Sequence, residues 1–569
     1  MPVNGNRITV DPITRIEGHL RIDVEVTGGK VSNSWSSAQA FRGIETIMRG
    51  KDPRSAWAMT QRFCGVCTTT HALGSIRTVE DALNVTVPKN AHMLRNLVST
   101  MQSLQDHIVH FYHLTALDWV DIVSALNADP VQTGKIAESL TDFSPIQRGW
   151  KNNSMNAMKN VKERLAAFVG TKNLGIYGTG YWGHSAMKLT PEINLLGFAH
   201  YLEALEYQRK IAQAVAIIGS KNPHIQNLTV GGVTTAINFD NMAALNMERV
   251  QWIQELLNEV AEFVRTVYIP DVIAIGSAYK EWFNLGKCSP NYIAVPDVPM
   301  NEELTDFAMK GGIILNGQFR EIKTWKDEGL RKGITENTTH AWYKNDQDTL
   351  HPYEGDQVPY YHGWEENGKY SWAKAPRFED NVTQTGPIAQ VLAGYMAGAE
   401  DVVKYVDFVK AKAGINIEQL NSIMGRNVAR AIRALLMVDK AQLCLDTLLD
   451  NCKTDQKYVN YLEAVPTDKE YIGVGFNEAP RGMLSHWIKI KNGLIENYSA
   501  VVPSTWTAGP RDEKGRRGPY EESLIDLPIA KMEEPLEVIR SIHSFDPCIA
   551  CAVHTIDPEG KEGVSVKIR

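Results

Sequence analysis

The pattern of hydrophobic and polar positions divides the chain into β-rich ends and a helical middle. Between residues 20 and 26, Leu, Ile and Val alternate with polar residues, which predicts a strand with one face on the core. Gly28-Gly29 supplies a turn before a second strand at 31–35. Near the other end, a strand at 487–490 leads into Asn492-Gly493, a dipeptide typical of a hairpin turn.

From Leu94 to Phe111, apolar residues recur at steps of three and four, the period of a helix with one buried face. Residues 276–380 are rich in Gly, Pro, Trp and Tyr without strong periodicity, which predicts loops and short strands. Further helices are predicted at 193–219, 244–268, 385–412 and 417–452. We therefore predict one α+β domain that is mainly α, with a bundle of long central helices and β-rich N- and C-terminal parts.

The composition argues against some classes of protein but does not indicate a function. The 569 residues are 43% hydrophobic and 22% charged, which is enough apolar material for a large core. A net charge of −7 gives no hint of nucleic acid as a partner, since such a protein needs a concentrated basic face. No apolar run approaches the ~18 residues of a membrane span. The N-terminus lacks a secretory pattern, so we expect a soluble chain without its own export signal.

Four of the seven cysteines form two Cys-x-x-Cys pairs, Cys64 with Cys67 and Cys548 with Cys551. Thiolates at this spacing can reach one soft metal or a metal cluster. A structural zinc or rubredoxin-like iron site is the main alternative, but its pairs are usually separated by roughly 12–20 residues. Here the separation is 548 − 67 = 481 residues. A fold that joins both ends around one metal favours a functional centre over a structural one; a redox dithiol is a weaker alternative.

The sequence around both pairs resembles the large subunits of nickel–iron hydrogenases. The family's two metal-binding motifs are similar to Arg62-x-Cys64-Gly65-x-Cys67-x-x-x-His71 and Asp546-Pro547-Cys548-x-x-Cys551-x-x-His554. The resemblance is closest to the membrane-associated, periplasm-facing uptake type. It continues in Arg15-Ile16-Glu17-Gly18-His19, Phe41-Arg42-Gly43-Ile44-Glu45, His110-Phe111-Tyr112-His113-Leu114, Gly180-Tyr181-Trp182-Gly183-His184, Pro223-His224-Ile225-Gln226, Glu478-Ala479-Pro480-Arg481-Gly482 and Pro503-Ser504-Thr505-Trp506.

The resemblance implies a nickel ion held by all four cysteines, with Cys67 and Cys551 also bridging to an iron that carries CN⁻ and CO ligands. The implied reaction is H₂ ⇌ 2H⁺ + 2e⁻ by heterolytic cleavage. A terminal thiolate such as Cys548 is the implied base, and Glu17 is the residue expected to take the proton onward.

The resemblance also implies the residues around the metals. Arg481 is expected over their open face with Pro480 beneath it, and Asp106 and Asp546 as the carboxylates that balance the buried guanidinium. His71 is expected to hydrogen-bond a bridging sulfur. Pro503 and Ser504 are expected to contact the diatomic ligands on iron.

A second, hard metal is implied as well. Glu45, the backbone carbonyl of Ala500 and His554 match the family's magnesium ligands, with waters completing an octahedron. Since a histidine on magnesium is chemically unusual, this expectation rests on the resemblance alone. His224 is expected near the side of the chain where electrons leave.

The family also suggests a processed C-terminus. Residues 1–554 would form the hydrogenase large-subunit domain, and 555–569 a propeptide that a maturation endopeptidase removes after His554, with chaperones loading nickel beforehand. We hypothesise that the tail keeps Cys548 and Cys551 away from the core until nickel is in place. A disordered terminus is the plain alternative.

Four plausible ligand cysteines cannot hold both an active site and an electron relay. The resemblance therefore implies an iron–sulfur small subunit that carries the clusters, in a heterodimer or a dimer of heterodimers. The expected location is the periplasm, exported with that subunit, with a membrane electron acceptor reached indirectly. A hydrogen-sensing regulatory subunit is the alternative function, and a zinc-bearing structural protein is a third.

Overall fold

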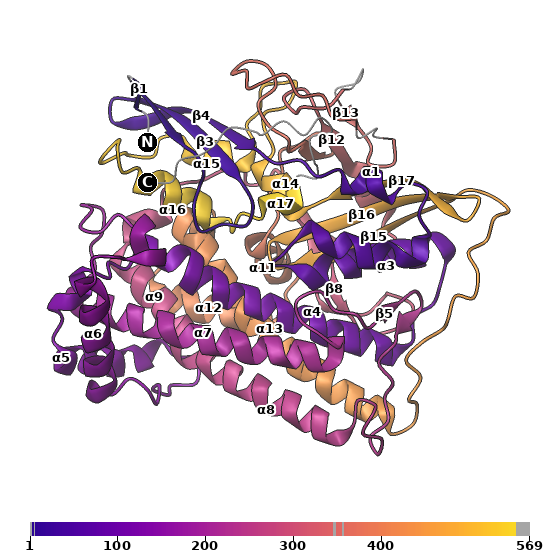
Figure 1. Cartoon of the computed structure of the whole chain (residues 1–569), viewed down its shortest axis with the longest axis horizontal. Helices are drawn as coiled ribbons and strands as arrows, with labels where there is room; N and C mark the ends of the chain where they lie inside the picture. The colour runs from indigo at the N-terminus through magenta and orange to yellow at the C-terminus, as the bar shows by residue number, and fades with distance from the viewer. Residues whose placement is uncertain (1–2, 5, 345–348, 355–357, 553–569) are drawn as a thin grey trace.

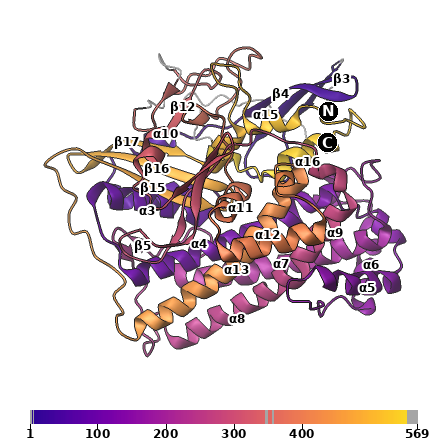
Figure 2. The ribbon, with the colours of Figure 1, turned by 180° about the vertical axis from the view of Figure 1, so that it is seen from behind.

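A computed structural model describes residues 3–4, 6–344, 349–354 and 358–552. Four long helices lie side by side across one half of the molecule, and the sheets and C-terminal helices cover the other half (Figures 1 and 2). The bundle helices are α4 (Lys89–Val109), α7 (Pro191–Gly219), α8 (Met247–Phe263) and α13 (Ile423–Cys452). Helix α4 packs on both α7 and α13, and α7 also packs on α8. The predicted α+β fold with a central helical bundle is confirmed.

Side chains just before these helices explain where they begin. Thr190, Asn246 and Ser422 each accept a hydrogen bond from a backbone N–H in the first turn, of α7, α8 and α13 respectively. Residues 423–438 of α13 are buried all round, so this helix forms the centre of the bundle. Among the described residues, no helix combines the length and hydropathy that crossing a bilayer requires.

The predicted β-rich ends are two antiparallel sheets. The N-terminal sheet has the order β1 (Val3–Asn4), β2 (Arg7–Val10), β3 (Leu20–Thr27) and β4 (Lys30–Ala38), and the C-terminal sheet the order β15 (Tyr471–Ala479), β16 (Gly482–Lys491) and β17 (Leu494–Val501). The Gly28-Gly29 and Asn492-Gly493 turns have positive φ at both positions. That geometry is typical of tight hairpins, and it confirms both predicted turns.

Short strands fill the region between 276 and 380, as predicted, and two more precede it. They are β5 (Leu228–Thr229), β6 (Gly232–Val233), β7 (Tyr292–Ala294), β8 (Asp297–Pro299), β9 (Phe307–Met309), β10 (Gly311–Leu315), β11 (Gln318–Ile322), β12 (Ile334–Asn337), β13 (Thr349–Leu350) and β14 (Ala375–Phe378). The remaining shorter helices are α1 (Ile44–Met48), α2 (Ala56–Thr60), α3 (Thr68–Leu83), α5 (Pro130–Ser139), α6 (Met155–Gly170), α9 (Ile269–Ala278), α10 (Glu328–Gly333), α11 (Pro387–Met396), α12 (Glu400–Ala413), α14 (Pro503–Ala508), α15 (Pro519–Leu524), α16 (Leu536–Ser544) and α17 (Ile549–Ala552).

Three helix predictions were wrong in extent. The helix predicted at 417–452 begins only at Ile423, after a separate 3₁₀ turn at Glu418–Leu420. The predicted helix at 385–412 is two helices, α11 and α12, because Gly398 adopts a left-handed φ of 70° that ends the first. The helix predicted at 244–268 begins at Met247 and continues through a π-helical turn at 264–268 into α9. Pro270 stands in the first turn of α9, where its missing N–H costs least, so it did not mark an end.

The site is positioned by elements from both ends of the chain. Helix α3 packs along β15 and β16, and the first cysteine pair immediately precedes it. Helix α17 contains Cys551 and packs on α14, which contains Pro503 and Ser504. The two ends of the sequence therefore meet above the helical bundle (Figure 1).

Candidate metal centre

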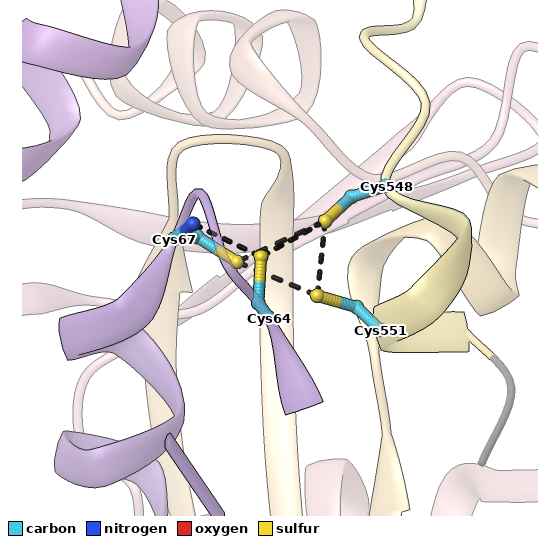
Figure 3. Close-up of side chains that lie close together, drawn as sticks. All are labelled: Cys64, Cys67, Cys548 and Cys551. Carbon is cyan, nitrogen blue, oxygen red and sulfur yellow. Dashed lines mark hydrogen bonds between the residues drawn. The ribbon is translucent and has the colours of Figure 1, made fainter. Parts of the chain in front are cut away.

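The four predicted cysteine ligands converge on one point. Their sulfur atoms all lie within 4.8 Å of one another, and each cysteine is at most 4% exposed. Cys64 and Cys548 sulfurs are 3.2 Å apart, and those of Cys548 and Cys551 are 2.9 Å apart. Cys67 Sγ is 3.5 Å from Cys551 Sγ. Figure 3 shows the first pair pointing toward the second, from segments that lie at opposite ends of the sequence.

The first cysteine loop is organised by its own backbone. It joins a 3₁₀ turn at Gln61–Phe63 to α3, and Cys67 is the residue that caps α3. The backbone N–H groups of Val66 and Cys67 donate to Cys64 Sγ at 3.2 and 3.0 Å. Two N–H donors and the positive end of a helix both favour the thiolate over the thiol.

The second cysteine segment is held by distant residues. Glu17 forms an isolated parallel bridge with Cys548, in which Ile549 N–H donates to the Glu17 carbonyl at 2.8 Å. The Ala550 N–H donates to Glu17 Oε2 at 2.9 Å. The Cys548 N–H donates to Ser504 Oγ at 3.0 Å. Gly18 is required beside this bridge, because a Cβ there would lie 2.4 Å from the Ala550 nitrogen.

Arg42 links the two segments and was not predicted to do so. Its guanidinium donates to the carbonyl oxygens of Arg62 (2.8 Å) and Phe63 in the first loop. It also donates to the carbonyl oxygen of Ala550 in the second, at 2.7 Å. The only sequence signal for this residue is its place in the motif at 41–45, since nothing in the spacing indicates a contact across 508 residues.

The donor set fits one soft metal. Two sulfurs that each lie ~2.3 Å from a tetrahedral metal are separated by ~3.8 Å, and sulfur–sulfur distances from 2.9 Å (Cys548 to Cys551) to 4.0 Å (Cys67 to Cys548) bracket that value. None of the four cysteines forms a disulfide. Burial raises the pKa of Cys548 and Cys551 well above the usual value, so these two buried thiols would carry protons without a metal charge beside them.

A small cavity lies beside Cys67 and Cys551. It has a volume of about 10 Å³ and is lined by Cys67, Cys548 and Cys551 but not by Cys64. Its other walls include His71, Pro480, Arg481, Pro503 and Ser504. The structure thus brings both residues expected to contact the diatomic ligands, Pro503 and Ser504, to one cavity beside the two expected bridging cysteines.

Arg481 brings a buried positive charge to this cavity. Its guanidinium lies 3.0 Å from Asp106 Oδ2 and 2.9 Å from Asp546 Oδ1, and it also donates to the Asp546 carbonyl oxygen. Burial alone would lower its pKa, but Asp546, Cys548 and Asp106 together raise it well above the usual value. The side chain therefore stays charged, with the two carboxylates expected from the sequence as its partners.

Glu17 lies beside the sulfur of Cys548, which is expected to be a terminal ligand. Its Oε2 is 3.3 Å from Cys548 Sγ. Burial, followed by the charge of Cys64, raises the Glu17 pKa to about 7, whereas the bond to Cys548 opposes the shift. A carboxyl with a pKa near neutrality exchanges protons readily in both directions. Its neighbour Arg15 pairs instead with Asp118, at 2.5 Å.

Behind the cavity, His71 belongs to a chain of buried side chains. Its Nδ1 lies 3.1 Å from His486 Nε2, and His486 Nδ1 lies 2.6 Å from the Tyr498 hydroxyl oxygen. Burial lowers the pKa of His71 to about 4 and that of His486 well below its usual value, so both rings are neutral. No spacing in the sequence indicated His486 or Tyr498, which lie on β16 and β17.

Two of the three expected magnesium ligands lie together. Glu45 is buried and its Oε1 accepts a hydrogen bond from the Ala500 N–H at 2.7 Å. Burial raises the Glu45 pKa to about 7. His554 lies outside the described residues, as does the proposed propeptide. Cys548 and Cys551 are buried in the described part of the chain, and the role of the tail before nickel loading stays a prediction.

Comparison with known proteins agrees with this arrangement. Residues 42–554 match the family model described as nickel-dependent hydrogenase, and residues 7–34 match one described as HoxL-like. The chain is 45% identical to the Hydrogenase-2 large chain of Escherichia coli (strain K12), with 99% of each chain covered. It is 42% identical to the uptake hydrogenase large subunit of Rhizobium leguminosarum bv. viciae, with 100% of this chain and 98% of that one covered.

Solved structures give the same result for the fold. The Ni-Fe-Se hydrogenase from D. vulgaris Hildenborough in the reduced state superposes with a TM-score of 0.76 at 30% sequence identity. The match covers 96% of this chain and 99% of that one. With four buried cysteines at one point and similarity along nearly the whole length, the chain belongs to the nickel-dependent hydrogenase family, as a nickel–iron hydrogenase large subunit.

Proposed function

We propose that this chain interconverts H₂ with two protons and two electrons at a nickel–iron centre held by its four paired cysteines. When bound, such a centre supplies soft, redox-active metals that polarise H₂ for heterolytic cleavage. The observation that carries the proposal is the convergence of four buried sulfurs from both ends of the chain. The residues that would surround an iron with CN⁻ and CO ligands line one small cavity, namely Cys67, Cys551, Pro503 and Ser504. Similarity to uptake hydrogenases favours this function over hydrogen sensing.

The chain's own residues handle the proton. Cys548 Sγ is the base that accepts it, and Glu17 Oε2 receives it across 3.3 Å. The Ala550 N–H holds that carboxylate oxygen in place at 2.9 Å. Since the Glu17 pKa is about 7, the carboxyl releases the proton near neutral pH rather than trapping it. Glu17 is therefore the first carrier on the outward path.

Arg481 and the cavity walls control the charge and the solvent around the centre. Four thiolates bring negative charge into a buried site, and the charged Arg481 guanidinium offsets part of it. Pro480 and Pro503 add apolar surface that has no hydrogen bond to offer water. Ser504 has two roles, because it faces the cavity and also accepts from the Cys548 N–H.

Electrons leave on the side of Cys64. His224 Nε2 lies 3.1 Å from the Cys64 carbonyl oxygen, and the ring is only partly buried. Beside it is a groove of about 600 Å³ whose walls include Ile47, Trp57 and Ile225. Ile47 is 47% exposed in the wall of this groove. We assign this groove to an iron–sulfur small subunit, the partner that the names "large chain" and "large subunit" of the relatives imply.

Three further expectations from the family resemblance belong to this proposal. Glu45, the Ala500 carbonyl and His554 would hold Mg²⁺, because Glu45 and Ala500 already lie together. A maturation endopeptidase would remove residues 555–569 after nickel-loading chaperones have acted. The mature heterodimer would lie on the periplasmic side of a membrane, anchored through its partners. Mass spectrometry of active protein tests the second property: nickel-loaded, active enzyme of full length would exclude it.

Infrared spectroscopy combined with metal analysis tests the proposed function. The purified heterodimer, prepared with its maturation proteins, should contain one nickel per large subunit. It should also show CN⁻ and CO stretching bands in the window between protein and water absorption. Stoichiometric zinc with no such bands would contradict the proposal and favour a structural site.

A further inference from the structure

A row of three buried side chains leads away from the cavity wall. His71 comes from α3, His486 from β16 and Tyr498 from β17, and none is more than 1% exposed. They are joined by the 3.1 Å contact between the rings and the 2.6 Å contact from His486 Nδ1 to the hydroxyl. Helix α3 lies close enough for the ring contact because residue 74 is glycine; a Cβ there would be 3.2 Å from His486 Cδ2.

The row ends on a ring nitrogen that has no partner in the described part of the chain. Among the described residues, His71 Nε2 is buried without a hydrogen-bond partner. The His71 side chain lines the cavity together with Cys67 and Cys551. Cys67 caps α3 and His71 lies in the first turn of that helix. The expected partner of Nε2 is therefore a bridging thiolate at this cavity.

Hydrogen bonding permits only two proton arrangements along such a row. A neutral imidazole has one donor nitrogen and one acceptor nitrogen, so the choice at one ring fixes the choice at the next. If the Tyr498 hydroxyl donates to His486 Nδ1, then His486 Nε2 donates to His71 Nδ1 and the remaining proton sits on His71 Nε2. In the opposite arrangement, His71 Nε2 presents a lone pair to the sulfurs.

Electrostatics selects the first arrangement. A lone pair directed at thiolates is repelled, whereas an N–H directed at a thiolate makes a charge-assisted hydrogen bond. The alternative of a doubly protonated His71 is unfavourable, because a cation here would lose its hydration in a fully buried place. Tyr498 can serve as the terminal donor, since a phenol keeps its proton in such surroundings.

We propose that His486 and Tyr498 are positioning residues that fix the tautomer of His71, so that His71 Nε2–H donates to a bridging thiolate. The inference rests on the proposed nickel–iron centre. A hydrogen bond withdraws electron density from the bridging sulfur and hence from iron. Residues of this kind, which orient a group that touches a ligand, change activity or metal affinity by roughly 10- to 100-fold when mutated.

The test compares four variants by infrared spectroscopy. Tyr498→Phe removes only the hydroxyl donor, and His486→Leu removes the whole link. Both should shift the CN⁻ and CO bands to lower wavenumber, because a thiolate without its hydrogen bond donates more electron density to iron. His486→Gln should keep the bands near their original positions, since its amide N–H can replace His486 Nε2–H. Tyr112→Phe is the matched control: it removes a buried hydroxyl that bonds Asp271 at 2.8 Å, outside the site.

Band positions carry the result, so incomplete metal loading of a variant does not obscure it. Unshifted bands in both Tyr498→Phe and His486→Leu would overturn the proposal, as would an equal shift in Tyr112→Phe. Turnover measured at saturating H₂ should fall by about 10-fold in His486→Leu, with little change in the KM for H₂. Absence of CN⁻ and CO bands from the unmutated protein is a different failure, because it contradicts the proposed function itself.

Discussion

The two cysteine segments are held in place in different ways. The first loop is organised locally, since two of its own N–H groups donate to Cys64 Sγ and α3 begins at Cys67. The second segment is held instead by hydrogen bonds to residues elsewhere in the chain. Glu17, Ser504 and Arg42, all far away in sequence, hold the backbone of residues 548–550.

This difference assigns different tasks to the two loops. A locally organised loop keeps its geometry whether or not the rest of the site is closed. A segment held by distant groups takes its position only when they are already in place. We infer that the first pair is preformed and that docking of the second pair completes the site. The following predictions test that asymmetry, in order of decreasing effect on the centre.

Loss of a cysteine should have the largest effect. Cys548→Ala removes the sulfur that lies nearest to two of the other three. Purified protein should then retain almost no nickel and show no H₂ oxidation. Cys444→Ala is the control, because Cys444 is equally buried but lies on α13, outside the cluster. Equal nickel content in both variants would show that the four-sulfur assignment is wrong.

Glu17→Gln should reduce turnover without loss of metal. The amide can still accept from the Ala550 N–H, so the second segment stays docked, but it cannot carry a proton from Cys548. We expect a fall of ~100-fold in H₂ oxidation, the lower range for general acid–base catalysis. Nickel content should be unchanged, and Glu25→Gln on β3 should behave like the unmutated enzyme. A variant with full activity would exclude Glu17 as the first proton carrier.

Arg42→Leu tests the link between the two segments. It removes charge-assisted hydrogen bonds worth roughly 1.5–3 kcal/mol each, of which one reaches Ala550. The second segment should undock more often, and nickel should be lost to a chelator about 10-fold faster. Arg54→Leu, which removes a partly exposed pair with Asp52, serves as the control. Equal rates of nickel loss in the two variants would argue against the link.

Asp118→Asn should have the smallest effect on the centre and a distinct pH dependence. Burial would raise the Asp118 pKa, but Arg15 and His543 hold it below the usual value. The folded carboxylate thus contributes stability above the unfolded pKa of ~3.9, and this is lost as pH falls through the lower folded value. Urea unfolding should show a variant that is less stable than the unmutated protein at pH 6, with a smaller difference at pH 3. A constant difference would contradict this role.

The sequence predicted the site residues that belong to a motif with a recognisable spacing. It did not predict the residues that only the fold brings to the site. The sequence predicted both cysteine pairs from their spacing. It predicted Arg481 and Glu17 from the family resemblance. Arg42, His486 and Tyr498 could not be assigned roles, since those depend on the β16–β17 register and on how closely α3 approaches β16. Hydrophobic periodicity gives no information about contacts between residues that lie about 400 positions apart in the sequence.

The same limit applies to helix ends. The regular apolar spacing across 385–412 continues through Gly398, so hydrophobic periodicity predicted one helix. The left-handed conformation at that glycine decides the break, and the Ala399 N–H then bonds back to the Gly394 carbonyl at 3.0 Å. A long apolar pattern therefore locates a helical region more reliably than it counts the helices within it.

X-ray diffraction data collected on the purified heterodimer above and below the nickel absorption edge test the central claim most directly. The account predicts one nickel peak per large subunit, within ~2.3 Å of the sulfurs of Cys64, Cys67, Cys548 and Cys551 alike. A nickel bound by only one of the two pairs, or a zinc edge in its place, would contradict the conclusion that both ends of the chain build one nickel centre.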